Sequence, residues 1–253
     1  MSEVIWELFY VFCLFAGAFA ACEIGYRLGR YVGPKDEAFT RQLEIIRGAT
    51  FALVAFLIAF AFSGAGSRYV DRLDLIVKEA NAIGTAYLRA DVLPQPQRGE
   101  LKDALRQYTA GRLDLLAAED PAATAALLAK VGPQQRHMWD VALQGIAGNA
   151  QLMRVVLPPL NDVIDLHTTH LSAARRHIPL AIMVALMVSA ALALALAAFG
   201  NGQIDRRFPV LNFVYGFVLA SALWMTIDLD HPRWGTIEAS NQPLVNQLAS
   251  MKP

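Results

Sequence analysis

The chain alternates between long apolar runs and a polar, amphipathic middle. Four runs approach or reach the roughly 20 apolar residues that a helix needs to cross about 30 Å of hydrocarbon. They are Val4 to Tyr26, Gly48 to Gly66, Ile178 to Phe199 and Pro209 to Asp228. This pattern predicts four membrane-spanning helices.

The segment between the second and third runs, 67–177, follows a different pattern. Its apolar residues recur at spacings of three and four, beginning with Val70, Leu73 and Val77, which is typical of one buried helix face. Prolines divide it into five predicted helices, of which the later ones begin after Pro96, at Pro121, at Pro133 and at Pro158-Pro159. Asp120 stands where it can cap the helix that begins at Pro121. We therefore expect a helical bundle.

The second apolar run and the bundle join without a helix breaker. No proline occurs from Ile45 to Leu93, so one continuous helix is expected to leave the membrane and become the first helix of the bundle. The predicted fold is all-α and polytopic, with the bundle inserted between the second and third membrane helices. Its predicted parts are membrane helices 1 and 2 (4–66), the soluble bundle (67–177), membrane helices 3 and 4 (178–228) and a polar tail (229–253), which packs on the bundle or on a neighbouring subunit.

Small residues recur at every fourth position in two of the apolar runs. The first run contains Cys13, Gly17, Ala21, Gly25 and Gly29, and the third contains Ala181, Ala185, Ser189, Ala193 and Ala197. Lipid provides no hydrophobic force between helices, so close backbone packing over small residues is a common way to hold them together. We expect both stripes to be helix-packing surfaces.

Composition agrees with a membrane protein and excludes several function classes. Hydrophobic residues make up 55% and charged residues 17%, against roughly 25% charged residues in ordinary soluble domains. A formal net charge of zero gives no reason to expect nucleic-acid binding. The sequence contains no phosphate-binding glycine loop, no Gly-x-Ser-x-Gly elbow and no His-Glu-x-x-His motif. Neither an enzyme nor a cofactor is predicted.

Three residues in the apolar runs are candidates for an ion path. Phe56 and Phe60 lie one turn apart on the second run, and a ring of such side chains from several subunits would form a hydrophobic constriction that gates by dewetting. The alternative is that they face lipid or pack between helices. Glu23 could lie at a pore mouth, or it could pair with Arg27 four residues later.

Histidines and carboxylates gather on the last predicted helix of the bundle. Asp162, His167 and His170 are the residues that a metal ion would take, because imidazole and carboxylate are zinc ligands. The cluster lacks a defined ligand motif, so a polar helix face that happens to contain histidines is the favoured explanation. No metal is therefore predicted.

Several stretches resemble a family of membrane domains that is usually described as bestrophin-like. They include Phe62-Ser63-Gly64-Ala65, the run from Lys78 to Arg89, Leu160 to Asp165, Arg175 to Pro179 and Asp228 to Gly235. The resemblance implies a bacterial membrane protein with four helices and a helical insert after the second. More distantly it extends to the bestrophins, which are pentameric anion channels with an apolar neck on the second helix, so Phe56 and Phe60 would be neck residues. The bestrophins' acidic calcium-clasp pattern has no match here.

These observations favour a homo-oligomeric ion channel lined by the second membrane helix, with anion conduction and a pentamer as the expectations that the bestrophins add. The expected partners are further copies of the chain, the lipid bilayer and inorganic ions, and the expected location is the bacterial inner membrane. Basic residues near the membrane ends are almost evenly divided between the two sides, so the side of the insert stays undecided. Two alternatives stay open: a non-conducting sensor or scaffold whose insert binds a partner or ligand, and a metal-dependent membrane enzyme that uses His167 and His170.

Overall fold

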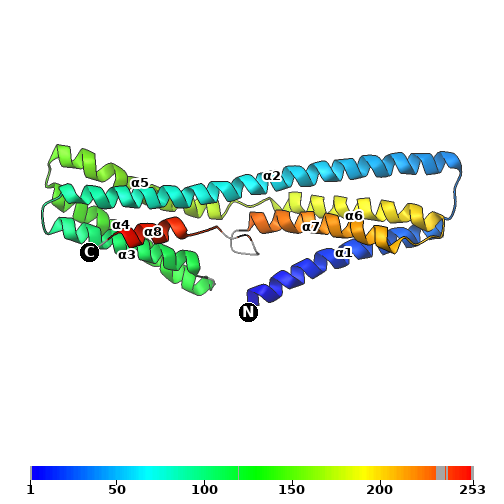
Figure 1. Cartoon of the computed structure of the whole chain (residues 1–253), viewed down its shortest axis with the longest axis horizontal. Helices are drawn as coiled ribbons and strands as arrows, with labels where there is room; N and C mark the ends of the chain where they lie inside the picture. Colours follow the sequence, from blue (N-terminus) through cyan, green and yellow to red (C-terminus); the bar gives the residue numbers. More distant parts are fainter. Residues whose placement is uncertain (1, 119, 232–236, 238, 252–253) are drawn as a thin grey trace. The chain divides into compact units, whose positions relative to one another are not determined.

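All secondary-structure elements in the described part of the chain are helices (Figure 1). The computed structural model describes residues 2–118, 120–231, 237 and 239–251. In chain order the elements are α1 (Ser2–Val32), α2 (Glu37–Arg89), the 3-10 helix η1 (Ala90–Val92), α3 (Gln97–Ala117), α4 (Pro121–Ile146), α5 (Ala150–Ala174), α6 (Leu180–Gln203), α7 (Pro209–Asp230) and α8 (Gln242–Ser250). The predicted all-α class is confirmed.

Among the described residues, four helices are long and apolar enough to cross a membrane. They are α1, α2, α6 and α7, which contain the four apolar runs of the sequence. Helices α3, α4 and α5 follow α2 and precede α6, so the helical insert lies between the second and third of these helices as predicted. The chain is therefore an all-α membrane protein.

The chain forms two compact units. Unit 1 comprises Met1–Tyr69 and His177–Glu238, and unit 2 comprises Val70–Arg176 and Ala239–Pro253. The boundary at Tyr69 falls inside α2, which continues without a break past Ser63 and Gly66. With 53 residues and a rise of 1.5 Å per residue, α2 is about 80 Å long. The prediction of one continuous helix is confirmed.

Helices α1 and α6 in unit 1 approach each other so closely that only glycine fits at the contact. A Cβ atom at Gly25 would overlap the backbone of Ala195, and one at Gly29 would overlap the backbone of Phe199. From the α6 side, a Cβ atom at Gly202 would overlap the carbonyl of Tyr26. The small-residue stripe of α1 therefore does pack against a helix, at Gly25 and Gly29.

The stripe predicted on α6 is only partly a packing surface. Ala193 and Ala197 are buried, but Ala181 and Ala185 are exposed. The residues of α6 that meet α1 belong to another face, which contains Ala198 and Gly202. Within one chain the first half of the stripe is uncovered, so a packing role for Ala181 and Ala185 stays a prediction about contacts between copies.

The first part of α2 completes unit 1. Its residues Val54, Ile58 and Ala61 are buried against Leu186 and Ala190 of α6, with Leu223 of α7 in the same cluster. Side chains on this face recur at spacings of three and four, as a helix with one packed face requires. One face of α2 is thus fixed in the core of unit 1, and the opposite face is not.

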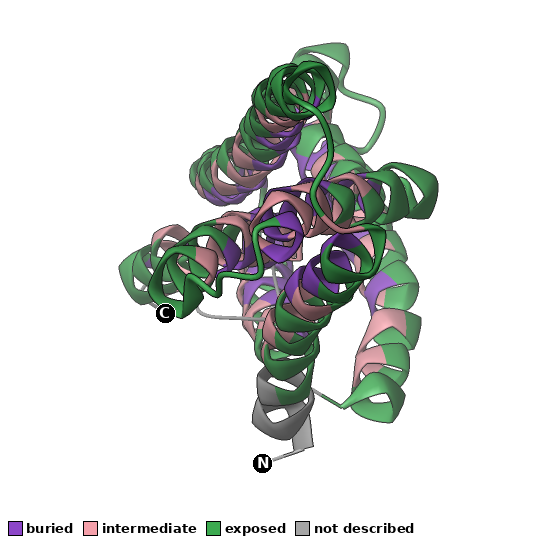
Figure 2. Ribbon diagram, turned by 90° about the vertical axis from the view of Figure 1, so that its right-hand side faces the viewer, coloured by how far each residue is buried: buried purple, intermediate pink, exposed green. Residues whose placement is uncertain are grey.

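Unit 2 has its own hydrophobic core. Along the helices of the chain, buried positions alternate with exposed ones, as helices with one packed face require (Figure 2). Ile83 of α2, Leu105 and Tyr108 of α3, Met138 of α4 and Leu160 of α5 are at most 1% exposed. The C-terminal α8 joins this core through Leu244, which is fully buried. A Cβ atom at Gly84 would press on the side chain of Gln247 in α8, so Gly84 leaves room for the tail to pack on the bundle.

Two predicted helix boundaries in the bundle were wrong. Pro133 lies inside α4, and Pro158 and Pro159 lie inside α5, which begins at Ala150 with Asn149 as its cap. Burial on both sides of each proline, for example Val131 and Met138 in α4, stabilises the continuous helix despite the lost backbone hydrogen bond. The predicted cap at Asp120 is confirmed, because its carboxylate accepts a hydrogen bond from the N–H of Ala123 at 2.9 Å.

Candidate functional site

Phe56 and Phe60 lie on the face of α2 that the rest of unit 1 leaves uncovered. Their side chains are 67% and 75% exposed, whereas Val54 and Ile58 on the packed face are 1% and 7% exposed. The face continues through Ala52 and Ser63, which are exposed as well. Within one described chain the two phenylalanines do not pack between helices, so what covers them is lipid or another copy of the protein.

Glu23 is the centre of an ion-pair network at the C-terminal half of α1. It accepts a hydrogen bond from Arg27 at 2.8 Å, which is the pairing that the sequence suggested. It also accepts two hydrogen bonds from Arg207, at 3.0 and 3.3 Å. No local pattern predicts this contact, because Arg207 is 184 positions away along the chain. Only the parallel packing of α1 and α6 brings the α6–α7 loop to α1.

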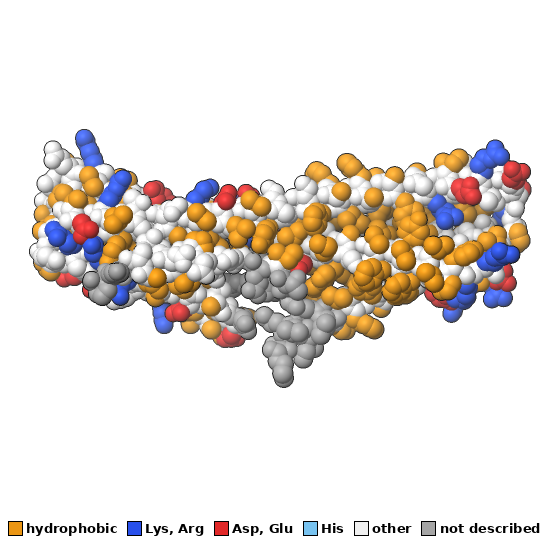
Figure 3. Space-filling view, viewed as in Figure 1, with side chains coloured by type: hydrophobic (Ala, Val, Ile, Leu, Met, Phe, Trp, Pro, Cys, Tyr) orange, Lys and Arg blue, Asp and Glu red, His pale blue; other side chains and the backbone are white. Residues whose placement is uncertain are grey.

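A second carboxylate extends this network. Asp205 accepts a hydrogen bond from the hydroxyl of Tyr26 at 3.1 Å and forms an ion pair with Arg30 at 3.2 Å. The guanidinium of Arg207 lies over the ring of Tyr26, 4.2 Å from its centre. Charged side chains gather at this end of unit 1 beside a surface that is mainly hydrophobic (Figure 3). The network lies where the apolar part of α1 ends and charged residues begin. Its ion pairs hold α1 to the α6–α7 loop.

The three candidate metal ligands, Asp162, His167 and His170, lie in different environments. His170 is buried in unit 2, with its Nδ1 3.0 Å from a carboxylate oxygen of Glu79. Glu79 also accepts two hydrogen bonds from Arg112, at 2.6 and 3.0 Å, and both residues are at most 2% exposed. His170 is therefore engaged with a buried ion pair.

The buried pair of Glu79 and Arg112 could have been found in the sequence. Glu79 follows Ile76 by three positions and precedes Ile83 by four, so it lies on the apolar face of its helix. A charged residue on such a face needs a buried partner. Arg112 stands in the corresponding position of α3, four residues after Tyr108. Each charged residue alone is an exception to the apolar pattern of its helix face. The two exceptions are explained if Glu79 and Arg112 pair with each other in the core.

Asp162 does not share this environment. It is exposed and lines an open polar groove of about 500 Å³ with Lys78, Asn81, Asp165 and others of α2 and α5. His167, by contrast, is buried, and its Nδ1 has no hydrogen-bond partner among the described residues. The structure thus leaves Asp162 on the surface and the two histidines in the interior. A metal site of these three residues remains an untested hypothesis.

His167 makes the stability of the protein depend on pH. Burial, together with the nearby charge of Arg112, lowers the pKa of His167 to about 4, against about 6.5 in an unfolded chain. Between these values the unfolded state binds the proton and the native state does not, so stability falls as the pH falls, by up to about 1.4 kcal/mol per pH unit. We expect chemical unfolding followed between pH 7 and pH 4 to show this slope and His167→Gln to reduce it. The exposed His137→Gln serves as the control, and an unchanged slope in His167→Gln would contradict the assignment.

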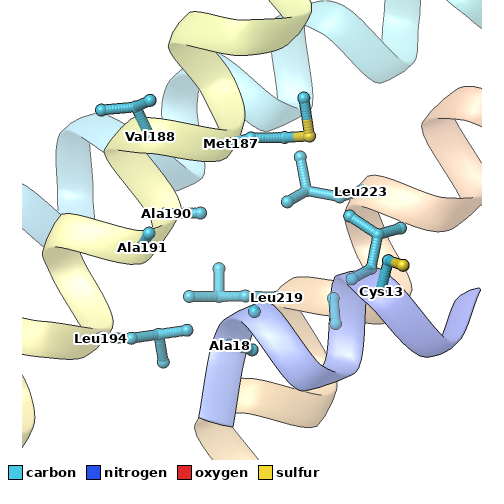
Figure 4. A pocket seen from close by; sticks show the side chains of 12 residues that line it. Cys13, Ala18, Met187, Val188, Ala190, Ala191, Leu194, Leu219 and Leu223 are labelled. Carbon is cyan, nitrogen blue, oxygen red and sulfur yellow. The ribbon is translucent and has the colours of Figure 1, made fainter. Parts of the chain in front are cut away.

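A cavity in unit 1 opens where α1 moves away from α6 (Figure 4). Nothing lies within 4 Å of a Cβ atom built at Gly17, although Gly25, two turns later, touches the backbone of α6. The cavity has a volume of about 300 Å³, and its lining is apolar, including Met187, Leu219 and Leu223. The thiol of Cys13 is the reactive group in this lining, and no charged side chain is among the described residues that form it.

The described structure is that of a helical membrane protein with one uncovered apolar helix face and a separate helical unit. The model of the Bestrophin-like domain matches residues 16–244 of the chain. The chain therefore belongs to the bestrophin-like family, as the sequence motifs indicated. The last of those motifs extends over residues 232–235, which lie outside the described residues.

Solved structures support the same fold. Two single-residue variants of a bacterial Bestrophin homolog from Klebsiella pneumoniae are similar to this chain. The first has a TM-score of 0.67 and 17% identity, and the match covers 97% of this chain and 98% of the homolog. The second has a TM-score of 0.66 and 15% identity, and the match covers 97% of both chains. A further structure of that homolog matches with a TM-score of 0.59 at 15% identity, covering 98% of this chain and 96% of the other. No curated protein matches the chain. At such identities the likeness establishes the fold.

Proposed function

We propose that the protein is a homo-oligomeric ion channel whose conduction path is lined by α2. The observation that carries the proposal is the uncovered face of α2, which places Phe56 and Phe60 outside the core of unit 1 while the opposite face is packed. Membership in the bestrophin-like family and the resemblance to bestrophins, which are anion channels, support conduction and favour anions as the permeant species.

A path through a single chain is not compatible with the packing of unit 1. The clusters between α1, α2, α6 and α7 consist of buried apolar side chains, and the cavity among α1, α6 and α7 is apolar too. An ion in such surroundings would lose its hydration without compensation. A path between several copies, each contributing α2, avoids this cost because its wall needs only one helix face from each subunit.

The two phenylalanines are suited to a hydrophobic constriction. They are spaced by four residues, so each subunit would contribute two rings of aromatic side chains one helical turn apart. An apolar neck excludes water when it is narrow and admits hydrated ions when it widens, so a small movement of α2 would gate the path.

We propose a pentamer in the bacterial inner membrane, with each chain crossing it four times and contacting lipid and inorganic ions. Glu23, with its arginine partners, would lie near a mouth of the path. No catalytic chemistry is proposed.

Phe56→Ala and Phe60→Ala are expected to change conduction. Removing a ring from the constriction widens it and makes its wetting easier, so the current through purified protein in planar bilayers should increase or lose its gating. Phe12→Ala is the matched control, because Phe12 of α1 is equally exposed, at 69%, and lies on another helix. If all three variants changed the current to the same extent, α2 would not line the path.

Oligomeric state decides between this proposal and its alternative. A protein that is monomeric or dimeric in detergent and electrically silent in every salt would overturn the channel. The second candidate, a non-conducting sensor or scaffold, would then be favoured by the polar groove of unit 2, where Lys78 and Asp162 face a space of about 500 Å³.

A further inference from the structure

Three potential metal ligands from two distant segments meet in unit 1. His177 precedes α6, Asp230 is the last residue of α7, and His231 follows it. One ligand atom of each residue lies within 4.8 Å of a ligand atom of each of the other two residues. Among the described residues, these three form the group of potential metal ligands with this spacing. A metal ion with ligand bonds of about 2 Å requires its ligand atoms to lie closer together than this, so binding would draw the three side chains together.

Hydrogen bonds fix the same protonation state in both histidines. The Nδ1 atom of His177 lies 3.1 Å from the backbone carbonyl of Asp230, and the Nδ1 atom of His231 lies 3.0 Å from that of Ile227. A carbonyl oxygen only accepts hydrogen bonds, so each Nδ1 carries a proton, and in the neutral imidazole Nε2 is then the nitrogen with the lone pair. Metal-binding histidines are commonly oriented in this way, with the second ring nitrogen donating to a carbonyl. The two rings are stacked, with centres 4.7 Å apart.

Asp230 is held in a fixed orientation beside them. Its carboxylate is fully buried, the Nε of Arg68 donates a hydrogen bond to Oδ1 at 2.8 Å, and the Nη2 of Arg68 forms an ion pair with the same oxygen at 2.8 Å. The backbone N–H of Ile178 donates to Oδ2 at 2.8 Å, and Oδ2 lies 3.7 Å from Nδ1 of His177. Arg68 and the N–H of Ile178 therefore hold the carboxylate in one orientation beside His177. Such supporting contacts are typical of carboxylates that bind metal ions.

The chemistry of these ligands selects the metal. Two imidazoles and one carboxylate suit Zn²⁺, which commonly binds three protein ligands and keeps a fourth position for water. Ca²⁺ and Mg²⁺ require oxygen ligands and do not suit the set. A cavity of about 380 Å³ with a mainly apolar lining, which includes Met183 and Trp224, reaches His231.

We propose that His177, Asp230 and His231 form a Zn²⁺ site that joins the start of α6 to the end of α7. The two segments are 53 residues apart in sequence, and a bound ion would fix one against the other. The proposal is independent of conduction, because every residue that carries it lies within unit 1 and none belongs to the uncovered face of α2.

The test uses the full-length protein, purified in detergent, stripped with a chelator and then titrated with Zn²⁺. We expect one equivalent of Zn²⁺ per chain, a melting temperature that rises by about 5 °C at saturating metal, and no comparable uptake of Ca²⁺ or Mg²⁺. His177→Gln and His231→Gln should each weaken binding by at least about 10-fold, since each removes one of three ligands. His137→Gln, which changes an exposed histidine of α4, should bind as the wild type does.

Binding of Co²⁺ provides a readout that does not depend on stability. A visible ligand-field band is expected in the wild-type protein and in His137→Gln, and it should be absent in the double variant His177→Gln/His231→Gln. The variants are compared by circular dichroism without metal to confirm that they fold. Wild-type protein that retains neither Zn²⁺ nor Co²⁺, or a double variant that retains both in full, would overturn the proposal.

Discussion

Replacing Gly25 by alanine is expected to destabilise the protein by about 2–3 kcal/mol, whereas the same replacement at Gly17 should stabilise it by up to about 1 kcal/mol. Both glycines lie on the same stripe of α1. A methyl group at Gly25 would overlap the backbone of Ala195, which cannot move without displacing α6, while a methyl group at Gly17 meets nothing within 4 Å. At Gly17 only the helix propensity changes, and alanine is the better helix former.

The opposite signs make this pair a sharp test of the α1–α6 contact. Thermal or denaturant unfolding in a single detergent compares the two variants with the wild type under identical conditions. Gly29→Ala should behave as Gly25→Ala does, because a Cβ atom at Gly29 would overlap the backbone of Phe199. Equal effects at Gly17 and Gly25 would show that α1 does not approach α6 in the way described.

Glu79→Met is expected to cost about 3–5 kcal/mol, because it leaves the charge of Arg112 buried without its partner. Arg112 is 2% exposed and donates to both carboxylate oxygens of Glu79. The double variant Glu79→Met/Arg112→Met should recover a large part of this loss, since it removes both charges and keeps apolar volume in the core. His170 would then lose its acidic partner, so the recovery is expected to be incomplete.

Glu37→Met is the matched control for the buried pair. Glu37 pairs with Arg41 at 3.3 Å on the surface of the same helix, with both side chains at least 74% exposed, and such pairs contribute about 0–1 kcal/mol. Chemical unfolding monitored by helical circular dichroism gives all the values needed for a double-variant cycle. A loss below 1 kcal/mol in Glu79→Met would mean that the pair is hydrated rather than buried.

Much of the fold could be predicted because it depends on local patterns. Four apolar runs long enough to cross a bilayer predict four membrane helices without any knowledge of their neighbours. The continuity of α2 followed from the lack of a proline between Ile45 and Leu93, and the cap at Asp120 from its place before Pro121. These features depend on residues within a few turns of one another. The same local reasoning misplaced two helix starts in the bundle, because it could not weigh burial against the cost of a proline.

The candidate sites could be predicted from the sequence less completely than the fold. The pairing of Glu23 with Arg27 is a contact along one helix and was expected, but the contact with Arg207 requires the packing of α1 beside α6. His177, Asp230 and His231 meet because α6 and α7 bring their ends together. In the sequence His177 directly follows the bundle, whereas its neighbours in the structure come from the end of α7.

The sequence by itself determined the class of protein, the family and the order of the helices, because hydrophobic length, helix period and short motifs are properties of contiguous residues. Only the tertiary structure decided which face of α2 is packed and which leaves Phe56 and Phe60 uncovered, and that α8 packs on the bundle through Leu244. It also showed that two histidines meet Asp230, and it established the pairing of Glu79 with Arg112, for which the sequence carries a signal on each helix face. The physical reason is that a buried charge or a ligand group is defined by what surrounds it, and those surroundings come from segments that are far apart along the chain.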